Sequence, residues 1–152
     1  MNTQAASQVT MTSQREWALL LILAGIQFTH ILDFMIMMPL GPQLTAAFSI
    51  SDAKFGLLVS AYTFAAGASG LVASLYIDRF ERRRLLLILY VLFAAATLAC
   101  GLAPTYETLM SARFAAGLFG GILSAMIQTI VADVVPFARR GKAMGVIMTS
   151  FS

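Results

Sequence analysis

The chain has 152 residues, of which 59% are hydrophobic and 11% are charged, and its formal net charge is +3. This composition is far too apolar for a soluble domain of this length and indicates a membrane protein. The basic residues stand in short clusters beside apolar runs, which is typical of a membrane-orientation signal and argues against a nucleic-acid partner.

An apolar run from Ala18 to Met38 predicts the first membrane helix, since about 20 apolar residues span a bilayer. We expect a disordered cytoplasmic tail over residues 1–15, because that stretch is polar and has no hydrophobic period. Three helix-breaking residues, Pro39, Gly41 and Pro42, predict the end of the helix. The run lacks a signal-peptide cleavage site, so we expect it to remain in the protein.

Three further apolar runs predict membrane helices at about residues 55–77, 85–103 and 108–132. The second helix has small residues at spacings that let helices approach closely in lipid, namely Gly56, Ser60, Gly67, Gly70 and Ser74. A fifth run starts at residue 142 and stops after about 11 residues, too few to span. We therefore expect an all-α membrane domain over residues 16–152, with four helices and the start of a fifth.

Lysine and arginine are unevenly divided between the two ends of these helices. One end, formed by the tail and two basic links, has eight: Arg15, Arg79, Arg82, Arg83, Arg84, Arg139, Arg140 and Lys142. The other end has Lys54. Because short cytoplasmic loops retain basic residues, we expect a multi-pass protein of the cell membrane with its N-terminus in the cytoplasm.

Two opposite charges, Asp33 and Arg113, fall inside the predicted helices. Asp33 lies six residues before Pro39 and Arg113 five after Thr108, so both should lie roughly 7 to 9 Å below the outer boundary at ~1.5 Å per residue. An isolated charge in mid-membrane costs roughly 2.5 to 3.5 kcal/mol, so we expect a pair or a shared polar cavity. In a functional pair Asp33 would bind and release a proton beside Arg113, whereas a structural pair would only join two helices.

Other polar residues share these two helix faces. Gln27 and His30 precede Asp33 at spacings of three, and Gly117, Gly121, Ser124 and Gln128 follow Arg113 at spacings of three or four. His30 is a candidate proton relay, or else a hydrogen-bonded wall of a cavity. The candidates for lining a substrate cavity are Gln27, Met37, Ser124 and Gln128. Helix-to-helix hydrogen bonding is the alternative for the polar ones, and ordinary packing is the alternative for Met37.

A candidate charge cluster lies at the basic end, made of Asp78, Arg79, Arg82, Arg83 and Asp133. Orientation alone accounts for the arginines. It does not account for acids at the ends of two helices, which favour a cluster that locks the second, third and fourth helices in one state. Both interpretations stay open.

The turn SLYIDRFERRRLLL, from Ser74 to Leu87, resembles the cytoplasmic signature of the major facilitator superfamily, Gly-x-x-x-Asp-Arg-x-Gly-Arg-(Arg/Lys). Ser and Glu replace its two glycines at Ser74 and Glu81. Three further segments resemble motifs of the drug and sugar efflux branch, in which a proton is exchanged for the substrate. They are Leu32 to Leu44, then Leu109, Arg113, Gly117 and Gly121, then Pro136, Arg140, Gly141, Ala143 and Gly145.

This resemblance covers residues 16–152 and implies the N-terminal portion of a secondary active transporter. Family members have twelve helices in two halves and move small molecules by alternating access, and the arginine matched by Arg113 is implicated in proton coupling. The remainder of the transporter would then be a partner of this chain. We expect the chain alone not to transport, with the polar face from Gln27 to Asp33 open to lipid.

Two other functions compete with this one. A small four-helix multidrug transporter working as a dimer also uses an acid in its first helix, but the eight-to-one charge bias argues against it. A non-transporting tetraspan scaffold leaves two buried opposite charges unexplained. With one histidine and one cysteine, we expect no enzyme, no cofactor and no metal site. The expected partners are the lipid bilayer, protons and a small-molecule substrate.

Overall fold

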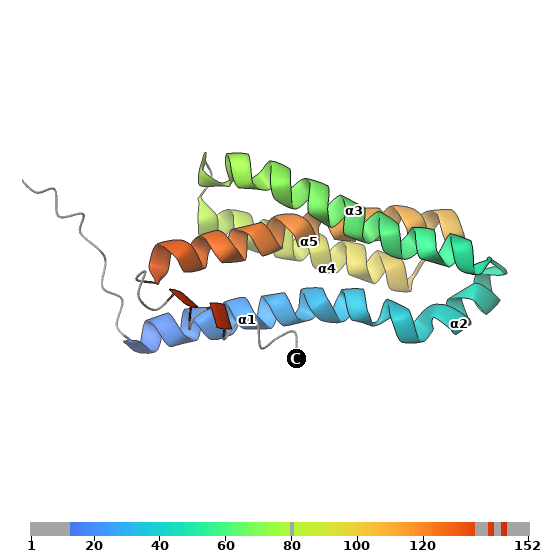
Figure 1. Cartoon of the computed structure of the whole chain (residues 1–152), viewed down its shortest axis with the longest axis horizontal. Coiled ribbons are helices and arrows are strands. Elements are labelled where there is room, and N and C mark those ends of the chain that lie inside the picture. The colour runs from blue at the N-terminus through green and yellow to red at the C-terminus, as the bar shows by residue number, and fades with distance from the viewer. Residues whose placement is uncertain (1–12, 80, 136–139, 142–143, 146–152) are drawn as a thin grey trace, which may run out of the picture.

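A computed structural model describes residues 13–79, 81–135, 140–141 and 144–145 (Figure 1). Its helices are α1 (Ser13–Met35), α2 (Met37–Phe48), α3 (Asp52–Tyr76), α4 (Arg82–Gly101) and α5 (Tyr106–Val134), with a short 3-10 turn, η1 (Ile77–Arg79), between α3 and α4. The described residues contain no strand, and they form four segments long and apolar enough to cross a membrane. The predicted all-α fold with four spans is confirmed.

The two ends of the predicted membrane domain can be compared with the structure only in part. The disordered tail was expected to extend to residue 15, but α1 already begins at Ser13. Residues 1–12 lie outside the described part. The start of a fifth helix at residue 142 also lies mostly outside it, with Met144 and Gly145 helical.

The sequence predicted that the first span ends at the prolines, and this prediction is wrong. The span runs from Trp17 to Phe48 through α1 and α2, with one non-helical residue, Ile36, between them. Pro39 is tolerated because it falls in the first turn of α2, where a backbone N–H has no helical partner in any case. Pro42 lies inside α2, as happens in membrane helices whose neighbours compensate for the lost hydrogen bond.

Side chains at the starts of α3 and α5 explain why these helices begin where they do. Ser51 accepts a hydrogen bond from the backbone N–H of Lys54, and Thr105 accepts one from that of Thr108. Each bond satisfies one of the N–H groups that a helix start leaves without a partner. Both caps lie at the end of the bundle where α2 meets α3, opposite η1 (Figure 1).

The most buried helix is α5, which lies between α3, α4 and α1 (Figure 1). It supplies more side chains to the main apolar cluster than any other helix, and they pack with Leu20 and Leu23 of α1 and with Leu89 and Phe93 of α4. By contrast, α4 has its apolar side chains largely exposed, for example Val91 and Leu98. These side chains are therefore free to contact lipid or another part of the protein.

Glycines bring α3 and α5 into close contact. A Cβ on Gly117 would lie 3.0 Å from the Cα of Tyr62, and one on Gly121 would lie 2.7 Å from the carbonyl carbon of Ala66. Of the small residues of α3 that were expected to let helices approach closely, Gly70 lies against α5, where a Cβ would be 3.3 Å from the backbone oxygen of Gly121. Gly56 and Gly67 have open space beside them, because α3 turns a different face, with Leu58, Tyr62, Ala65 and Ser69, toward the bundle.

Candidate functional site

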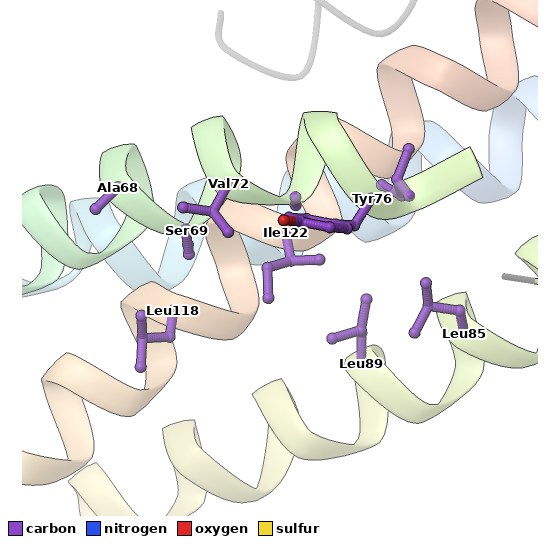
Figure 2. A pocket seen from close by; sticks show the side chains of 10 residues that line it. Ala68, Ser69, Val72, Tyr76, Leu85, Leu89, Leu118 and Ile122 are labelled. Atoms are coloured by element: carbon purple, nitrogen blue, oxygen red, sulfur yellow. The ribbon is translucent and has the colours of Figure 1, made fainter. Parts of the chain in front are cut away.

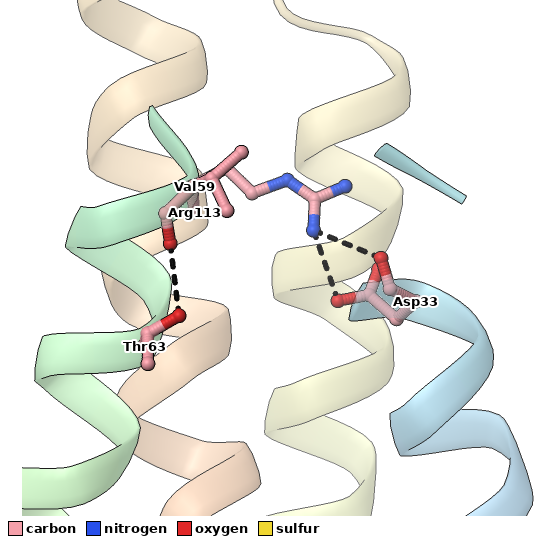
Figure 3. A network of polar contacts seen from close by, with 4 residues as sticks. All are labelled: Asp33, Val59, Thr63 and Arg113. Carbon is pink, nitrogen blue, oxygen red and sulfur yellow. Dashed lines mark hydrogen bonds and ion pairs between the residues drawn. The ribbon is translucent and has the colours of Figure 1, made fainter. Parts of the chain in front are cut away.

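The structure brings Asp33 of α1 and Arg113 of α5 together inside the bundle (Figure 3). The side chains are 4% and 6% exposed, and Nη1 of Arg113 lies 3.2 Å from Oδ2 of Asp33. The same nitrogen donates to the backbone oxygen of Asp33 at 3.1 Å. Two charges at this burial are tolerated in a membrane span because each neutralises the other.

The expected meeting of these charges is found, although the depth argument behind it was partly wrong. It counted residues from Pro39 as the end of the first helix, and the span continues to Phe48. Asp33 is therefore farther from the end of its own span than expected. Arg113 keeps its place near the start of α5, where its long side chain reaches Asp33.

An aromatic residue that the sequence did not single out, Tyr62 of α3, completes the surroundings of the pair. Its ring lies 5.8 Å from the guanidinium carbon of Arg113 and 6.0 Å from the ring of His30. A cation over the face of an aromatic ring is attracted by the ring's quadrupole. The signal was present in the sequence, since Tyr62 stands at helical spacing with Leu58, Ala65 and Ser69.

His30 lies against α5 at Gly120. A Cβ on Gly120 would fall on the His30 ring, and it would lie 3.2 Å from the Tyr62 hydroxyl. Both ring nitrogens of His30 and the hydroxyl oxygen of Tyr62 are buried, and none of these atoms has a hydrogen-bond partner among the described residues. Buried polar atoms without partners are uncommon, so this place can accept a water molecule, a proton or a substrate group.

Of the four residues predicted to line a substrate cavity, the structure brings two together. Ser124 donates a hydrogen bond of 3.3 Å to Oε1 of Gln27, which is buried. Met37 instead packs in a separate apolar cluster with Leu58 and Leu109. Gln128 is exposed. The polar face from Gln27 to Asp33 was expected to be open to lipid. This prediction is wrong for the described residues, because both side chains are buried.

The candidate charge cluster at the basic end is formed in part. Arg82 of α4 is paired with Asp133 of α5 and donates to the backbone oxygen of Thr129 at 3.4 Å. Arg79 and Arg83 are exposed, and Arg79 lies 5.4 Å from the centre of the Tyr76 ring. The side chain of Asp78 lies outside the described part. The described contacts therefore join the third and fourth spans, and the expected link to the second span depends on a side chain that is not described.

Known proteins and a protein family resemble this chain. The model of the Major Facilitator Superfamily matches residues 23–152. An uncharacterized MFS-type transporter of Bacillus subtilis, YhcA, is 30% identical over 128 residues, which are 84% of this chain and 24% of that protein. A lincomycin resistance protein of Streptomyces lincolnensis is 34% identical over 76% of this chain and 24% of its own length.

A crystal structure of a bacterial homolog of the human lysosomal transporter Spinster, inward-facing and unoccupied, has the same fold. Its TM-score is 0.85, with 21% identity, over 92% of this chain and 29% of that one. The chain thus spans about a quarter of the length of the curated relatives described above. With a family model that matches nearly all of it, the chain is a multi-pass membrane protein of the major facilitator superfamily.

Proposed function

We propose that the whole protein is a proton-coupled transporter that exports small molecules by alternating access, with Asp33 binding and releasing the proton. The observation that carries this proposal is the buried pair of Asp33 and Arg113. Ionisable groups inside membrane spans usually mark ion or substrate pathways. The lincomycin resistance protein among the relatives supports export as the direction.

The contacts of Arg113 fit a carboxylate that changes its charge. When Asp33 takes up a proton, Arg113 loses the attraction of the carboxylate. It keeps the backbone oxygen of Asp33 and the ring of Tyr62, neither of which depends on that proton. Asp33 can therefore be neutralised without leaving Arg113 wholly unpartnered. His30, three residues earlier in α1, is then the relay candidate, and Gln27 with Ser124 supplies hydrogen-bonding groups for a substrate.

The remaining parts of the proposal concern the two ends of the bundle. The basic end lies on the cytoplasmic side of the cell membrane, because arginine and lysine are retained on that side. There the Arg82 and Asp133 pair stabilises one of the alternating states, together with Asp78, Arg79 and Arg83. Charge networks between helices stabilise a state only while they are formed, so breaking this one shifts the population of states.

The test is transport by the full-length protein in vesicles with a proton gradient. Asp33→Asn keeps the size of the side chain but cannot ionise, so gradient-driven transport should be lost while exchange of substrate across the membrane persists. Asp52→Asn, an exposed acid at the start of α3, is the matched control and should transport normally. If a double variant, Asp33→Asn with Arg113→Gln, transports with an unchanged pH profile, Asp33 is not on the proton path.

A further inference from the structure

A groove with apolar walls opens between α3, α4 and α5, next to η1 (Figure 2). Its volume is about 450 Å³, and its walls include Ala68, Val72 and Tyr76 of α3, Leu85 and Leu89 of α4, and Ile122 of α5. Val72 and Tyr76 are more than half exposed, so no described part of the chain covers them.

The length of the groove matches one leaflet of a membrane. From Ala68 to Ile77 it follows α3 for about 14 Å at ~1.5 Å per residue. The hydrocarbon core of a bilayer is ~30 Å thick, so one leaflet is about half of that. A single acyl chain running down from the membrane surface therefore fits along it.

Positive charge lies where the groove reaches that surface. Arg79, Arg83 and Arg84 are exposed, and none of them forms an ion pair with another described side chain. Arg79 lies over the ring of Tyr76, which is part of the groove wall, and Arg84 directly precedes Leu85 on the opposite wall. Over residues 77–85 the sequence has four arginines against two acids, so the mouth keeps a positive balance.

We propose that this groove binds an anionic phospholipid, with one acyl chain along α3 and the phosphate on Arg79, Arg83 and Arg84. The apolar walls select hydrocarbon, and the arginines select a lipid with net negative charge over a zwitterionic one. Basic residues at a membrane surface attract anionic lipid. The proposal concerns the chain in a membrane and does not depend on transport.

Quenching of tryptophan fluorescence by brominated lipids tests it. In the chain with its single tryptophan removed, Trp17→Phe, a new reporter is placed in the groove with Tyr76→Trp. The matched reporter is Leu87→Trp, which lies between Leu85 and Leu89 in sequence but is 57% exposed and outside the groove. Brominated phosphatidylglycerol should be enriched at the groove reporter about fivefold over brominated phosphatidylcholine, the equivalent of about 1 kcal/mol. The Leu87 reporter should show no preference.

Variants then separate the two parts of the site. Replacing Arg79, Arg83 and Arg84 by Gln should abolish the preference, whereas Arg15→Gln, an exposed arginine of α1, should keep it. Ala73→Phe should shield the groove reporter from both lipids. Since the three arginines are exposed, circular dichroism should show unchanged helix content in their variants. The proposal is overturned if the preference survives the triple change, if both reporters behave alike, or if shielding rises with protein concentration, which would make a second copy the occupant.

Discussion

Arg113 holds Asp33 through a single nitrogen, Nη1, which reaches both the carboxylate at 3.2 Å and the backbone oxygen at 3.1 Å. Its Nε is buried and has no hydrogen-bond partner among the described residues. The backbone of α5 is in much closer contact with α3 than with α1. The pair is therefore a principal polar link between α1 and the rest of the bundle.

The two members of this pair should differ in what their loss costs. Asp33→Asn leaves Arg113 charged and buried, and a guanidinium cannot give up its proton in a protein. Removing one partner of a buried pair typically costs about 3–5 kcal/mol. Arg113→Gln should cost less, because the remaining carboxyl group can become neutral by binding a proton. Unfolding of the chain in detergent, followed by circular dichroism, measures both values.

The double variant, Asp33→Asn with Arg113→Gln, shows whether an unpaired buried charge causes the loss of stability in the single variants. It removes both charges and keeps groups that can hydrogen-bond, so it should be more stable than Asp33→Asn alone. Thr63→Val serves as a control, since the hydroxyl of Thr63 bonds only within α3, to the backbone oxygen of Val59 (Figure 3). Equal loss of stability in both single variants and in the double would show that packing, rather than charge, dominates here.

A second prediction concerns the close contact of α3 and α5. Gly121→Ala places a Cβ against the backbone of Ala66 and the hydroxyl of Ser69, and neither can move far within a packed pair of helices. Such overpacking typically costs about 1–3 kcal/mol. Gly67→Ala is the matched control, because nothing lies within 4 Å of its Cβ position. Alanine is favoured over glycine in a helix by about 0.5–1 kcal/mol, so this control should be slightly stabilising.

Thermal unfolding of the two alanine variants in the same detergent checks this contrast. A loss of stability at Gly67 comparable to that at Gly121 would place the contact on the other face of α3. That face is the one first expected from the spacing of Gly56, Gly67 and Ser74.

The sequence predicted the four spans and the pairing of Asp33 with Arg113 because both follow from strong energetic terms. Long apolar runs need a bilayer, and a buried charge needs a partner. It did not predict where the first span ends, since the effect of a proline depends on its place in the helix. Pro39 breaks a helix interior but is harmless in a first turn, and only the turn at Ile36 decides which applies.

The face that α3 presents was also beyond the sequence. Small residues occur on more than one side of this helix, and their spacing alone does not say which side meets α5. On the side that meets α5, the backbone of Tyr62 lies against Gly117 and its ring lies next to the guanidinium group of Arg113. For the same reason the packing of His30 on Gly120 needed the structure, because it joins residues 90 positions apart.

A third prediction tests that packing of His30. Gly120→Ala should push the ring away from α5, because the new methyl group occupies the ring's place. Since His30 is the one histidine of the chain, its reaction with diethylpyrocarbonate reports on this site alone. The variant should react faster than the native chain. Gly25→Ala, on α1 with open space beside it, should react at the native rate. An unchanged rate in Gly120→Ala would mean that the ring is not held against α5.

The last prediction concerns orientation. By sequence, eight basic residues flank one predicted end of the spans and Lys54 flanks the other, so the basic end should be cytoplasmic. In a Cys100→Ser background, a membrane-impermeant thiol reagent added outside intact cells should label Ser51→Cys and miss Arg83→Cys. Both positions are exposed in the structure, so a failure to react reports the side of the membrane rather than burial.

Permeabilised cells supply the control for this experiment, because there both cysteines should react. Reversed labelling in intact cells would invert the topology and with it the assignment of η1 to the cytoplasm. Labelling of both cysteines in intact cells would indicate insertion in two orientations. That result would favour a small dimeric transporter, a class that often inserts in both orientations, over the single orientation proposed above. Because Arg83→Cys leaves seven basic residues at its end against one, the substitution itself should not change the orientation.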